Sequence, residues 1–274
     1  MSVRAKALSF PADKQSIRLA QISDPHLFAD KGAEFLGLNP WDSFSAILSE
    51  LRYEPLDMVI GTGDLSQDHS IEAYRHFADG VRGLGVPVSA LPGNHDAFDR
   101  MELGLEGSGV MLDRRIILGP WQLLQLDSTV LGLPGGHLNH HRLEWLEAVL
   151  NYSSAYHTLI ALHHHPLDTG CVWLDQHRLD NGQEFNDLIR RFETVKGVVW
   201  GHVHQEMDER LDHIRMLAAP STSIQFRPHC RDFSLDNLQP GYRLLTLNAD
   251  GSIDTSIKRL SGDRFQPDRT ASGY

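Results

Sequence analysis

The sequence contains little cysteine and no long apolar run, and both absences exclude whole classes of protein. Only two of its 274 residues are cysteines, Cys171 and Cys230, and they form no CxxC pair. A disulfide framework and a thiolate zinc site are therefore not expected. No apolar stretch approaches the roughly 18 residues that a membrane-spanning helix needs, and residues 1–14 lack the continuous apolar stretch of a secretion signal. We predict a cytoplasmic protein that makes no contact with a membrane.

Positive charge is also scarce. The 25 lysines and arginines stand against 36 aspartates and glutamates, so the formal net charge at pH 7 is −11. A surface with this excess of negative charge repels the phosphate backbone of DNA and RNA, and we expect no nucleic-acid partner. A small anion can still bind, because bound metal cations reverse the local electrostatic field.

The composition is that of a folded globular domain. Hydrophobic residues make up 41% of the chain and charged residues 22%. Since the chain shows no internal repeat and no linker, we predict a single domain over residues 1–274. Its core should span about residues 15–260, while residues 261–274 are polar enough to form a mobile tail.

Strands and helices are expected to alternate up to residue 200. Asn39 can cap a helix that has Pro40 in its first turn, and Ser70 can cap the next one. Apolar residues at helical spacing predict two further helices, at 143–150 and 185–192. Apolar runs predict strands at residues 17–23, 57–62, 86–91, 121–127, 158–162 and 198–200.

The last part of the chain is rich in β-strand patterns. Residues 215–219, 242–248 and 252–258 read as strands, and Ala249-Asp250-Gly251 is a turn signal that joins the last two as a hairpin. Alternating units followed by antiparallel strands predict an α/β protein in which two mixed sheets pack together and are flanked by helices.

Five apolar runs, far apart in the sequence, each end in residues of the kinds that bind metal ions. The motifs are Asp24-Pro25-His26, Gly63-Asp64, Gly93-Asn94-His95-Asp96, His163-His164-His165-Pro166 and Gly201-His202-Val203-His204. One such ending usually marks an ordinary turn. Five in a row indicate oxygen and imidazole donors that converge at one rim of a sheet, where they can hold metal ions.

The spacing within these motifs suggests how two ions would be held. A carboxylate can bridge two divalent cations, and two metals about 3.5 to 4 Å apart can share a hydroxide that attacks phosphorus. We assign the bridging role to Asp64, because Gly63 before it lets the backbone come close to the ions. Asp24 and His26 are two positions apart in an extended loop, so both can reach one ion.

His202 and His204 have the same spacing and can act together in the same way. Asn94 supplies a neutral carbonyl oxygen. His95, the next residue, is displaced from the ligand shell and is free to donate a proton or to contact the phosphate of a substrate. We therefore predict Asn94 and His95 as substrate-binding residues, and His95 and Asp64 as catalytic residues.

These motifs, in this order, resemble those of the calcineurin-like metallophosphoesterases. Residues 163–166, 171–177, 221–223 and 226–230 are also similar to the bacterial 3′,5′-cyclic AMP phosphodiesterases of that superfamily, the class III cyclic nucleotide phosphodiesterases, and the likeness covers essentially the whole chain. The resemblance implies a four-layer α/β/β/α sandwich, which agrees with the pattern of strands and helices. It also implies hydrolysis of cyclic AMP to 5′-AMP by a metal-bridging hydroxide.

The same resemblance implies two sets of metal ligands and places His95 at the leaving group. The first set is Asp24, His26, Asp64 and His204, and the second is Asp64, Asn94, His163 and His202. His163 follows its strand directly, but a one-residue bulge there would give its role to His164, so both stay open. Two divalent ions are expected, with iron or manganese favoured and zinc as an alternative.

Other functions remain open at this point. The substrate can be another phosphoester, such as a glycerophosphodiester, a nucleoside diphosphate derivative or a phosphoprotein. A non-catalytic scaffold is disfavoured, because every expected ligand position is filled. Trp173 and Phe226 lie in loops and can stack on an adenine or simply pack against their neighbours. The expected partner is a small cyclic nucleotide, and the oligomeric state is left open.

Overall fold

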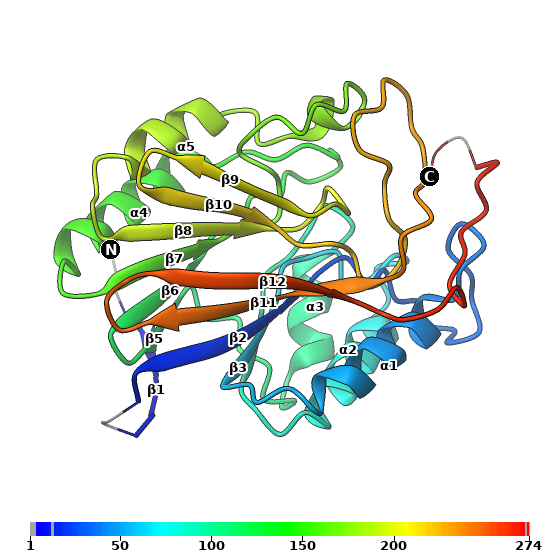
Figure 1. The fold of residues 1–274 in the computed structure, drawn as a ribbon, viewed down its shortest axis with the longest axis horizontal. Helices are drawn as coiled ribbons and strands as arrows, with labels where there is room; N and C mark the ends of the chain where they lie inside the picture. The colour runs from blue at the N-terminus through cyan, green and yellow to red at the C-terminus, as the bar shows by residue number, and fades with distance from the viewer. Residues whose placement is uncertain (1–3, 12–13, 272, 274) are drawn as a thin grey trace.

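Two β-sheets pack face to face, with helices on the outer side of each. The computed structural model describes residues 4–11, 14–271 and 273 of the chain. Figure 1 shows α4 and α5 on one outer side and α1 and α2 on the other, with both sheets between them. This is the predicted four-layer α/β/β/α sandwich with two mixed sheets, and the fold prediction is confirmed.

The larger sheet has seven strands. Their order is β1 (Lys6–Leu8), β5 (Arg115–Leu118), β6 (Trp121–Gln125), β7 (His157–Ala161), β8 (Val195–Trp200), β10 (Ile214–Ala218) and β9 (Met207–Leu211). Neighbours from β6 to β10 are parallel, whereas β5 with β6 and β9 with β10 are antiparallel. The carboxyl ends of β7 and β8 therefore lie at the same edge of the sheet.

The smaller sheet has five strands. Their order is β12 (Ile253–Arg259), β11 (Gly241–Asn248), β2 (Ser16–Ile22), β3 (Met58–Gly61) and β4 (Val88–Ala90). Three of these strands, β2, β3 and β4, are parallel, so their carboxyl ends also share an edge. The predicted hairpin is present: β11 and β12 are antiparallel, and Gly251 closes their turn with a positive φ of 89°.

Five α-helices and one short 3₁₀ helix cover the sheets in the described part of the chain. They are α1 (Pro40–Leu51), α2 (Ile71–Arg82), α3 (Phe98–Leu105), α4 (His140–Tyr152), η1 (Leu174–His177) and α5 (Gly182–Ile189). The predicted caps are present: the side chain of Asn39 accepts a hydrogen bond from Asp42 N at 2.9 Å, and that of Ser70 accepts one from Ala73 N at 3.1 Å.

Alternate strand residues build two apolar cores. Leu19 of β2 and Ile60 of β3 face the space between the sheets, where they belong to one buried cluster with Leu159 of β7. Val59, the neighbour of Ile60, faces the other way and belongs to the cluster under the helices, together with Phe77 of α2. The two sheets are therefore fixed relative to each other by side chains, which fixes the loops at their common edge.

The end of the chain packs along the body of the protein. Phe265 is buried, and the backbone N–H of Asp268 donates a hydrogen bond to Leu36 O at 2.7 Å. The mobility expected for residues 261–274 stays a prediction. In the described part of the chain, no helix combines the length and the apolar character needed to cross a membrane.

Candidate metal centre

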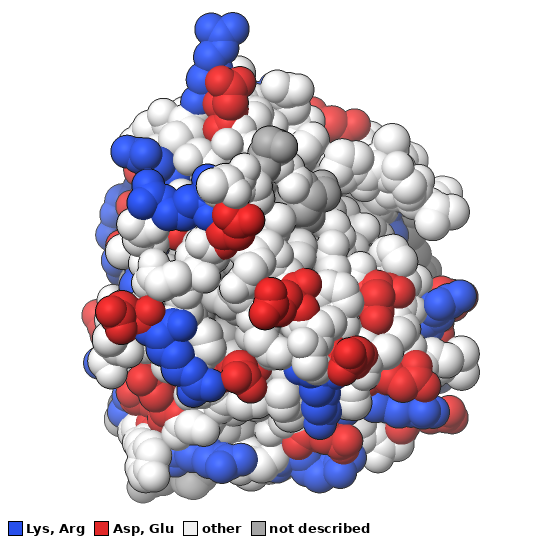
Figure 2. Space-filling view, turned by 90° about the vertical axis from the view of Figure 1, so that its right-hand side faces the viewer, with Lys and Arg blue, Asp and Glu red and all other residues white. Residues whose placement is uncertain are grey.

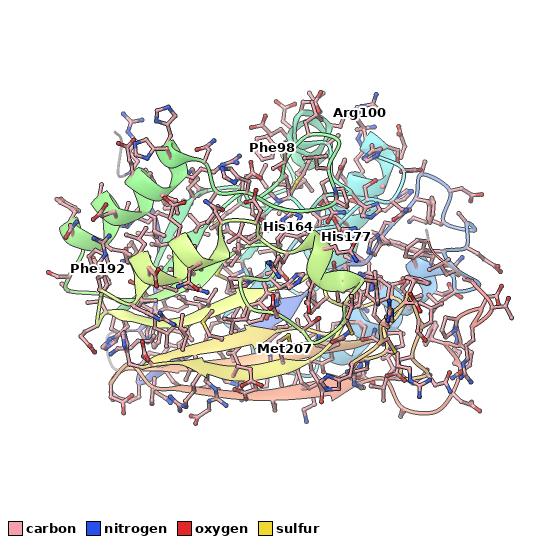
Figure 3. All side chains as sticks on the ribbon, turned by 90° about the horizontal axis from the view of Figure 1, so that it is seen from above. Phe98, Arg100, His164, His177, Phe192 and Met207 are labelled. Atoms are coloured by element: carbon pink, nitrogen blue, oxygen red, sulfur yellow. The ribbon has the colours of Figure 1, made fainter. Side chains whose placement is uncertain are left out.

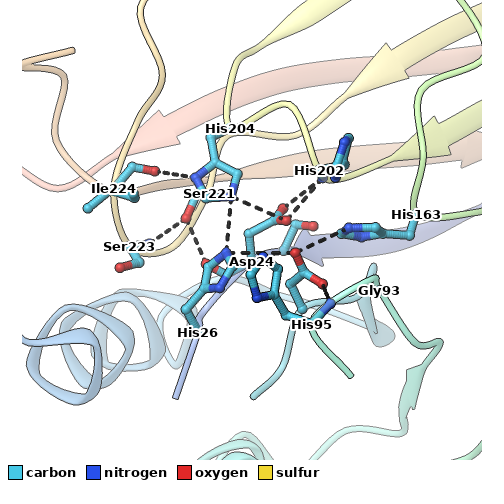
Figure 4. Close-up of polar contacts among 12 residues, drawn as sticks. Asp24, His26, Gly93, His95, His163, His202, His204, Ser221, Ser223 and Ile224 are labelled. Carbon is cyan, nitrogen blue, oxygen red and sulfur yellow. Dashed lines mark hydrogen bonds and ion pairs between the residues drawn. The ribbon is translucent and has the colours of Figure 1, made fainter. Parts of the chain in front are cut away.

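The five polar motifs meet at the edge where the parallel strands of both sheets end. Asp24 follows β2, Asp64 follows β3 and Asn94 follows β4, while the histidine motifs follow β7 and β8. Figure 4 shows the result: side chains from loops that are up to 180 positions apart in sequence come together at this edge. All eight predicted site residues belong to this cluster: Asp24, His26, Asp64, Asn94, His95, His163, His202 and His204.

Five of these residues have a left-handed backbone conformation. Their φ angles are 52° for Asp24, 49° for His26, 51° for Asp64, 66° for His202 and 47° for His204. The left-handed region costs an L-residue about 1–2 kcal/mol relative to the right-handed one. Such strain concentrates where function requires a particular side-chain direction. The strain at five of the eight positions is therefore consistent with a functional site.

One group of buried residues consists of Asp24, His26 and His204. Their ligand-type atoms lie within 4.8 Å of one another. The two Nε2 atoms of His26 and His204 are 3.1 Å apart, and His204 Nε2 is 3.4 Å from Asp24 Oδ1. The same Asp24 carboxylate accepts the backbone N–H of His202 at 3.0 and 3.1 Å, which connects the ends of β2 and β8.

In both His26 and His204, a hydrogen bond at Nδ1 fixes the tautomer of the ring. His204 Nδ1 lies 2.9 Å from the carbonyl oxygen of Ile224, which can only accept, so Nδ1 carries the proton. His26 Nδ1 lies 2.7 Å from Gln67 Oε1, which gives the same tautomer with the amide as oriented. In the neutral rings, two Nε2 lone pairs therefore face each other, an arrangement that a shared proton or a metal cation makes favourable.

Asp64 and His163 form the other half of the cluster with Asn94. His163 Nδ1 donates to Thr62 O at 2.8 Å, so its Nε2 points at Asn94 Oδ1, 3.1 Å away, and at Asp64 Oδ2, 3.3 Å away. Asp64 Oδ2 is also 3.8 Å from His26 Nε2. Asp64 thus lies between the two groups, which is the position that a bridging carboxylate requires.

His164 and His202 lie beside His163. His164 Nδ1 is 2.8 Å from Ser128 Oγ, whereas Nε2 of His164 and Nε2 of His202 are buried and have no hydrogen-bond partner among the described residues. One ring nitrogen from each of the three histidines fits within 4.8 Å of the others. The choice between His163 and His164 stays a prediction, although His163 is the one that faces Asp64 and Asn94.

The charges of the cluster favour a bound cation. Burial by itself would raise the carboxyl pKa values, but the neighbouring imidazoles outweigh it and lower the pKa of Asp24 and, more strongly, of Asp64. Burial opposes the charged form of His163, yet Asp64 raises its pKa to about 9. Burial dominates at His26 and lowers its pKa to about 3. The carboxylates stay ionised and attract positive charge to the ring nitrogens.

The residues fit a pair of divalent metal ions. Imidazole nitrogens, carboxylate oxygens and one amide oxygen converge without a lysine or arginine among them, and this donor set suits iron, manganese or zinc. Two glycines allow the close approach. A Cβ on Gly63 would collide with the His163 ring, and one on Gly93 would collide with the Asp64 carboxylate.

Asp96 holds the loops of the cluster in register. Its carboxylate accepts backbone N–H groups from Gly93 at 2.8 Å and from Leu65 and Ser66 at 3.1 Å. These bonds tie the loop after β3 to the loop after β4. Burial and the nearby Asp64 raise the pKa of Asp96 to about 7.

His95 lies beside the cluster. Its backbone N–H donates to Asp64 Oδ1 at 2.8 Å, and its ring meets that of His26 edge-on, with the centroids 5.1 Å apart. Burial lowers the pKa of His95. Asn94, His95 and His202 line a cavity of about 1040 Å³ that opens next to the cluster. This volume is at the upper end of the range for small-molecule sites.

The two aromatic residues considered for adenine stacking differ in position. Phe226 is 1% exposed and stacks on His204 at 4.1 Å, so it supports a ring of the cluster and its faces are not available to a ligand. Trp173 lines the cavity and packs edge-on against Phe226 and Phe233. The support from Phe226 and from Gln67 has no signature in the sequence, because it depends on loops that are distant along the chain.

Comparisons with known proteins agree with the geometry of the cluster. The family model described as Calcineurin-like phosphoesterase matches residues 17–206 of the chain. The chain belongs to this family. A dinuclear metal centre is typical of calcineurin-like phosphoesterases, and the histidine and aspartate clusters agree with it.

Two relatives of this calcineurin-like phosphoesterase match nearly from end to end. The "3′,5′-cyclic adenosine monophosphate phosphodiesterase CpdA" of Escherichia coli is 46% identical over 266 residues, which cover 96% of this chain and 97% of that protein. The protein of the same name from Pseudomonas aeruginosa is 37% identical, with 96% and 97% covered. A solved dimetal phosphatase from Danio rerio is 16% identical, with a TM-score of 0.66 over 90% of this chain and 100% of that one, and shows the same fold.

Proposed function

We propose that this protein hydrolyses 3′,5′-cyclic AMP to 5′-AMP with the help of two divalent metal ions. The observation that carries the proposal is the near end-to-end match, at 46% identity, to a protein named as a cyclic AMP phosphodiesterase. The buried cluster adds a physical reason, since its donors suit metals that activate water at neutral pH. The large cavity beside the cluster has room for a nucleotide.

We propose the two ligand sets that the sequence suggests. Asp24, His26, Asp64 and His204 would hold the first ion; Asp64, Asn94, His163 and His202 would hold the second. The distances around Asp64 and the tautomers of His26, His163 and His204 support these sets. Bound ions would activate a water molecule as nucleophile and neutralise charge on the phosphate. Iron or manganese is our favoured identity, with zinc as the alternative.

The residues of the chain would orient the substrate and move its proton. Asn94 and His95 reach the cavity from the loop after β4, so both can contact the phosphate. Burial lowers the pKa of His95, and the singly charged phosphodiester of a bound substrate beside the ring would oppose this shift. His95 would then give its proton to the 3′ oxygen as that oxygen leaves.

A substrate panel tests the proposal. The metal-loaded protein should convert cyclic AMP to 5′-AMP only, and ¹⁸O from labelled water should enter the phosphate and not the ribose. The panel should include cyclic GMP, a glycerophosphodiester, bis(p-nitrophenyl) phosphate, a nucleoside diphosphate derivative and a phosphoprotein. Turnover of cyclic AMP no faster than that of bis(p-nitrophenyl) phosphate would favour a broader phosphodiesterase. An exclusive 3′-AMP product would contradict the placement of His95 at the 3′ oxygen.

Other expectations from the sequence stay predictions. They are a cytoplasmic location and the absence of a nucleic-acid or membrane partner. Figure 2 looks onto the right-hand side of Figure 1, where acidic and basic side chains are interspersed rather than gathered into a single basic surface. On this face, the mixed charges agree with the expectation that no nucleic acid binds.

A further inference from the structure

The cavity beside the metal-ligand cluster has an apolar rim. Large hydrophobic side chains that are well exposed are few among the described residues: Tyr53, Phe98, Leu103, Leu131, Leu133, Tyr152, Val172 and Leu238. Three of these eight line this one cavity, namely Phe98 with an exposed fraction of 43%, Leu131 with 102% and Leu133 with 57%. Exposed apolar side chains that gather at one cavity usually contact a ligand or a partner.

The rim has two sides that belong to different parts of the fold. Phe98 is the first residue of α3, and the two leucines lie in the loop after β6. Figure 3 places Phe98 and His177 apart in the view from above, with His164 between them. Gly135, in the same loop as the leucines, lies against the backbone of His177. The loop that carries the leucines therefore meets the His177 side of the cavity at Gly135, whereas Phe98 enters the rim from α3.

Residues 128–137, which we call the leucine loop, are anchored to the metal-ligand cluster. At the start of this loop, Ser128 Oγ lies 2.8 Å from His164 Nδ1, and the backbone oxygen of Ser128 accepts the N–H of His137 at 2.9 Å. At the tip, Leu133 N donates to Val130 O at 3.0 Å and closes a tight turn. These bonds hold Leu131 and Leu133 in place although their side chains are exposed, so the loop presents a shaped apolar surface to the cavity.

Neither the fold nor the metal chemistry requires this apolar surface. An exposed leucine adds little to the stability of the fold, because its side chain stays in water. Phosphate and metal ions are strongly hydrated, and they would bind at the polar end of the cavity, which Asn94, His95 and His202 line. The apolar rim is therefore suited to a different part of the same ligand, one that gains free energy by leaving water.

We propose that Phe98, Leu131 and Leu133 form the subsite for the heteroaromatic base of the substrate. The inference rests on the proposed function and extends it from the phosphate to the base. The base would lie between the Phe98 ring and the two leucines while the phosphate reaches Asn94 and His95. Because apolar side chains contact the faces of a base and not its hydrogen-bonding edge, this subsite favours purine esters over base-free esters without separating adenine from guanine.

The test compares a substrate with and without its base. Leu131→Ser, Leu133→Ser, Phe98→Ser and the triple variant are assayed as metal-loaded proteins on cyclic AMP and on the 3′,5′-cyclic phosphate of 1-O-methyl ribose. Each single change should raise KM for cyclic AMP by about tenfold, the usual worth of a buried apolar side chain, and leave kcat within about twofold. KM for the base-free ester should not change.

Leu103→Ser is the matched control. Leu103 belongs to α3, as Phe98 does, and is 56% exposed, but it does not line this cavity. Its substitution should change neither KM nor kcat. All these side chains are exposed, so every variant should keep the thermal midpoint of the original protein, and a lower midpoint would expose an effect on folding instead.

Two results would overturn the subsite. KM for the two substrates could rise together, or the triple variant could leave KM for cyclic AMP unchanged. If the triple variant keeps its KM but loses self-association in light scattering, the rim is a contact between copies of the chain. If the original protein does not hydrolyse cyclic AMP at all, the proposed function fails. The subsite is then tested by calorimetric binding affinities, because the rim should make 5′-AMP bind more tightly than ribose 5-phosphate.

Discussion

The two halves of the metal-ligand cluster differ in what surrounds them. The His26 ring stacks on Phe35 and the His204 ring on Phe226, with ring centroids 4.7 Å and 4.1 Å apart. The Nδ1 atom of each histidine is also fixed by a hydrogen bond. On the other side, Asn94 and His202 line the open cavity. The first half is enclosed and oriented by the protein, whereas the second half faces the space where a substrate would bind.

This difference suggests a division of labour between two bound ions. An ion held by Asp24, His26 and His204 is surrounded by fixed donors and should exchange slowly. An ion held by Asn94, His163 and His202 is next to the cavity and should exchange faster, since solvent and substrate reach it. Asp64 lies 3.3 Å from His163 Nε2 and 3.8 Å from His26 Nε2, so it couples the two halves.

The largest effect should come from removing the charge that both halves share. Asp64→Asn keeps the shape of the side chain but withdraws a carboxylate from both proposed ions. We expect kcat to fall by about 10⁴-fold or more, with both ions bound less tightly. Metal analysis of the purified variant and steady-state kinetics measure this. Loss of one ion with the other unaffected would show that Asp64 belongs to one half alone.

Replacing His95 should separate proton transfer from metal binding. His95 lies beside the cluster, so His95→Ala should leave metal content normal and lower kcat for cyclic AMP by about 10²- to 10⁴-fold. An activated aryl ester, whose leaving group needs little protonation, should suffer much less. Equal losses on both substrates would count against the proton-donor role, and a loss of metal would mean that His95 is a ligand.

A substitution at Gln67, which contacts the first half of the cluster, tests whether the two halves bind their ions independently. Gln67 Oε1 lies 2.7 Å from His26 Nδ1 and fixes the orientation of that ring. Gln67→Leu should therefore lower the affinity for the first ion by about 10- to 100-fold, the usual effect of losing such a hydrogen-bond partner. The second ion should keep its affinity. Gln183→Leu, on the exposed side of α5, is the control. A chelator titration that followed two separate release steps would measure both affinities.

The smallest expected effect concerns the backbone. His204 has a φ of 47°, whereas His163 is not among the described residues with positive φ. In metal-free protein, His204→Gly should therefore be more stable than His204→Ala, by up to about 1 kcal/mol, because glycine adopts the left-handed conformation without strain. At His163 the order should be reversed. Denaturant unfolding measures both differences, and the same order at the two positions would argue against strain in the turn.

The sequence predicted the strands that carry the cluster, because a strand and the polar residue after it are local features. Asp24, Asp64 and His202 are all found where their apolar runs end. The strands β1, β5 and β9 and the helix α3 were not predicted. Phe98, Met101 and Leu105 have helical spacing, so a signal for α3 was present; β1 and β9 are short edge strands whose residues are partly exposed, and their pattern is correspondingly weak.

Contacts between distant loops could not be predicted. The stacking of Phe226 on His204, the bonds of Asp96 to the loop after β3 and the anchoring of the leucine loop at His164 each join segments whose proximity only the folded chain defines. The left-handed φ angles of the cluster residues could not be predicted either, because an aspartate or histidine in a turn carries no mark of its backbone conformation. The motifs located the candidate ligands, whereas the contacts that support them are visible only in the folded structure.

The most direct test of the account is a titration of metal-stripped protein with Mn²⁺ or Fe²⁺ in which bound metal and cyclic AMP hydrolysis are measured in the same samples. We expect no hydrolysis without metal, little after one ion per chain is bound, and full formation of 5′-AMP as occupancy approaches two ions per chain. Full hydrolysis by exhaustively stripped protein, or full activity at a single bound ion, would contradict a centre in which Asp64 joins two metal sites.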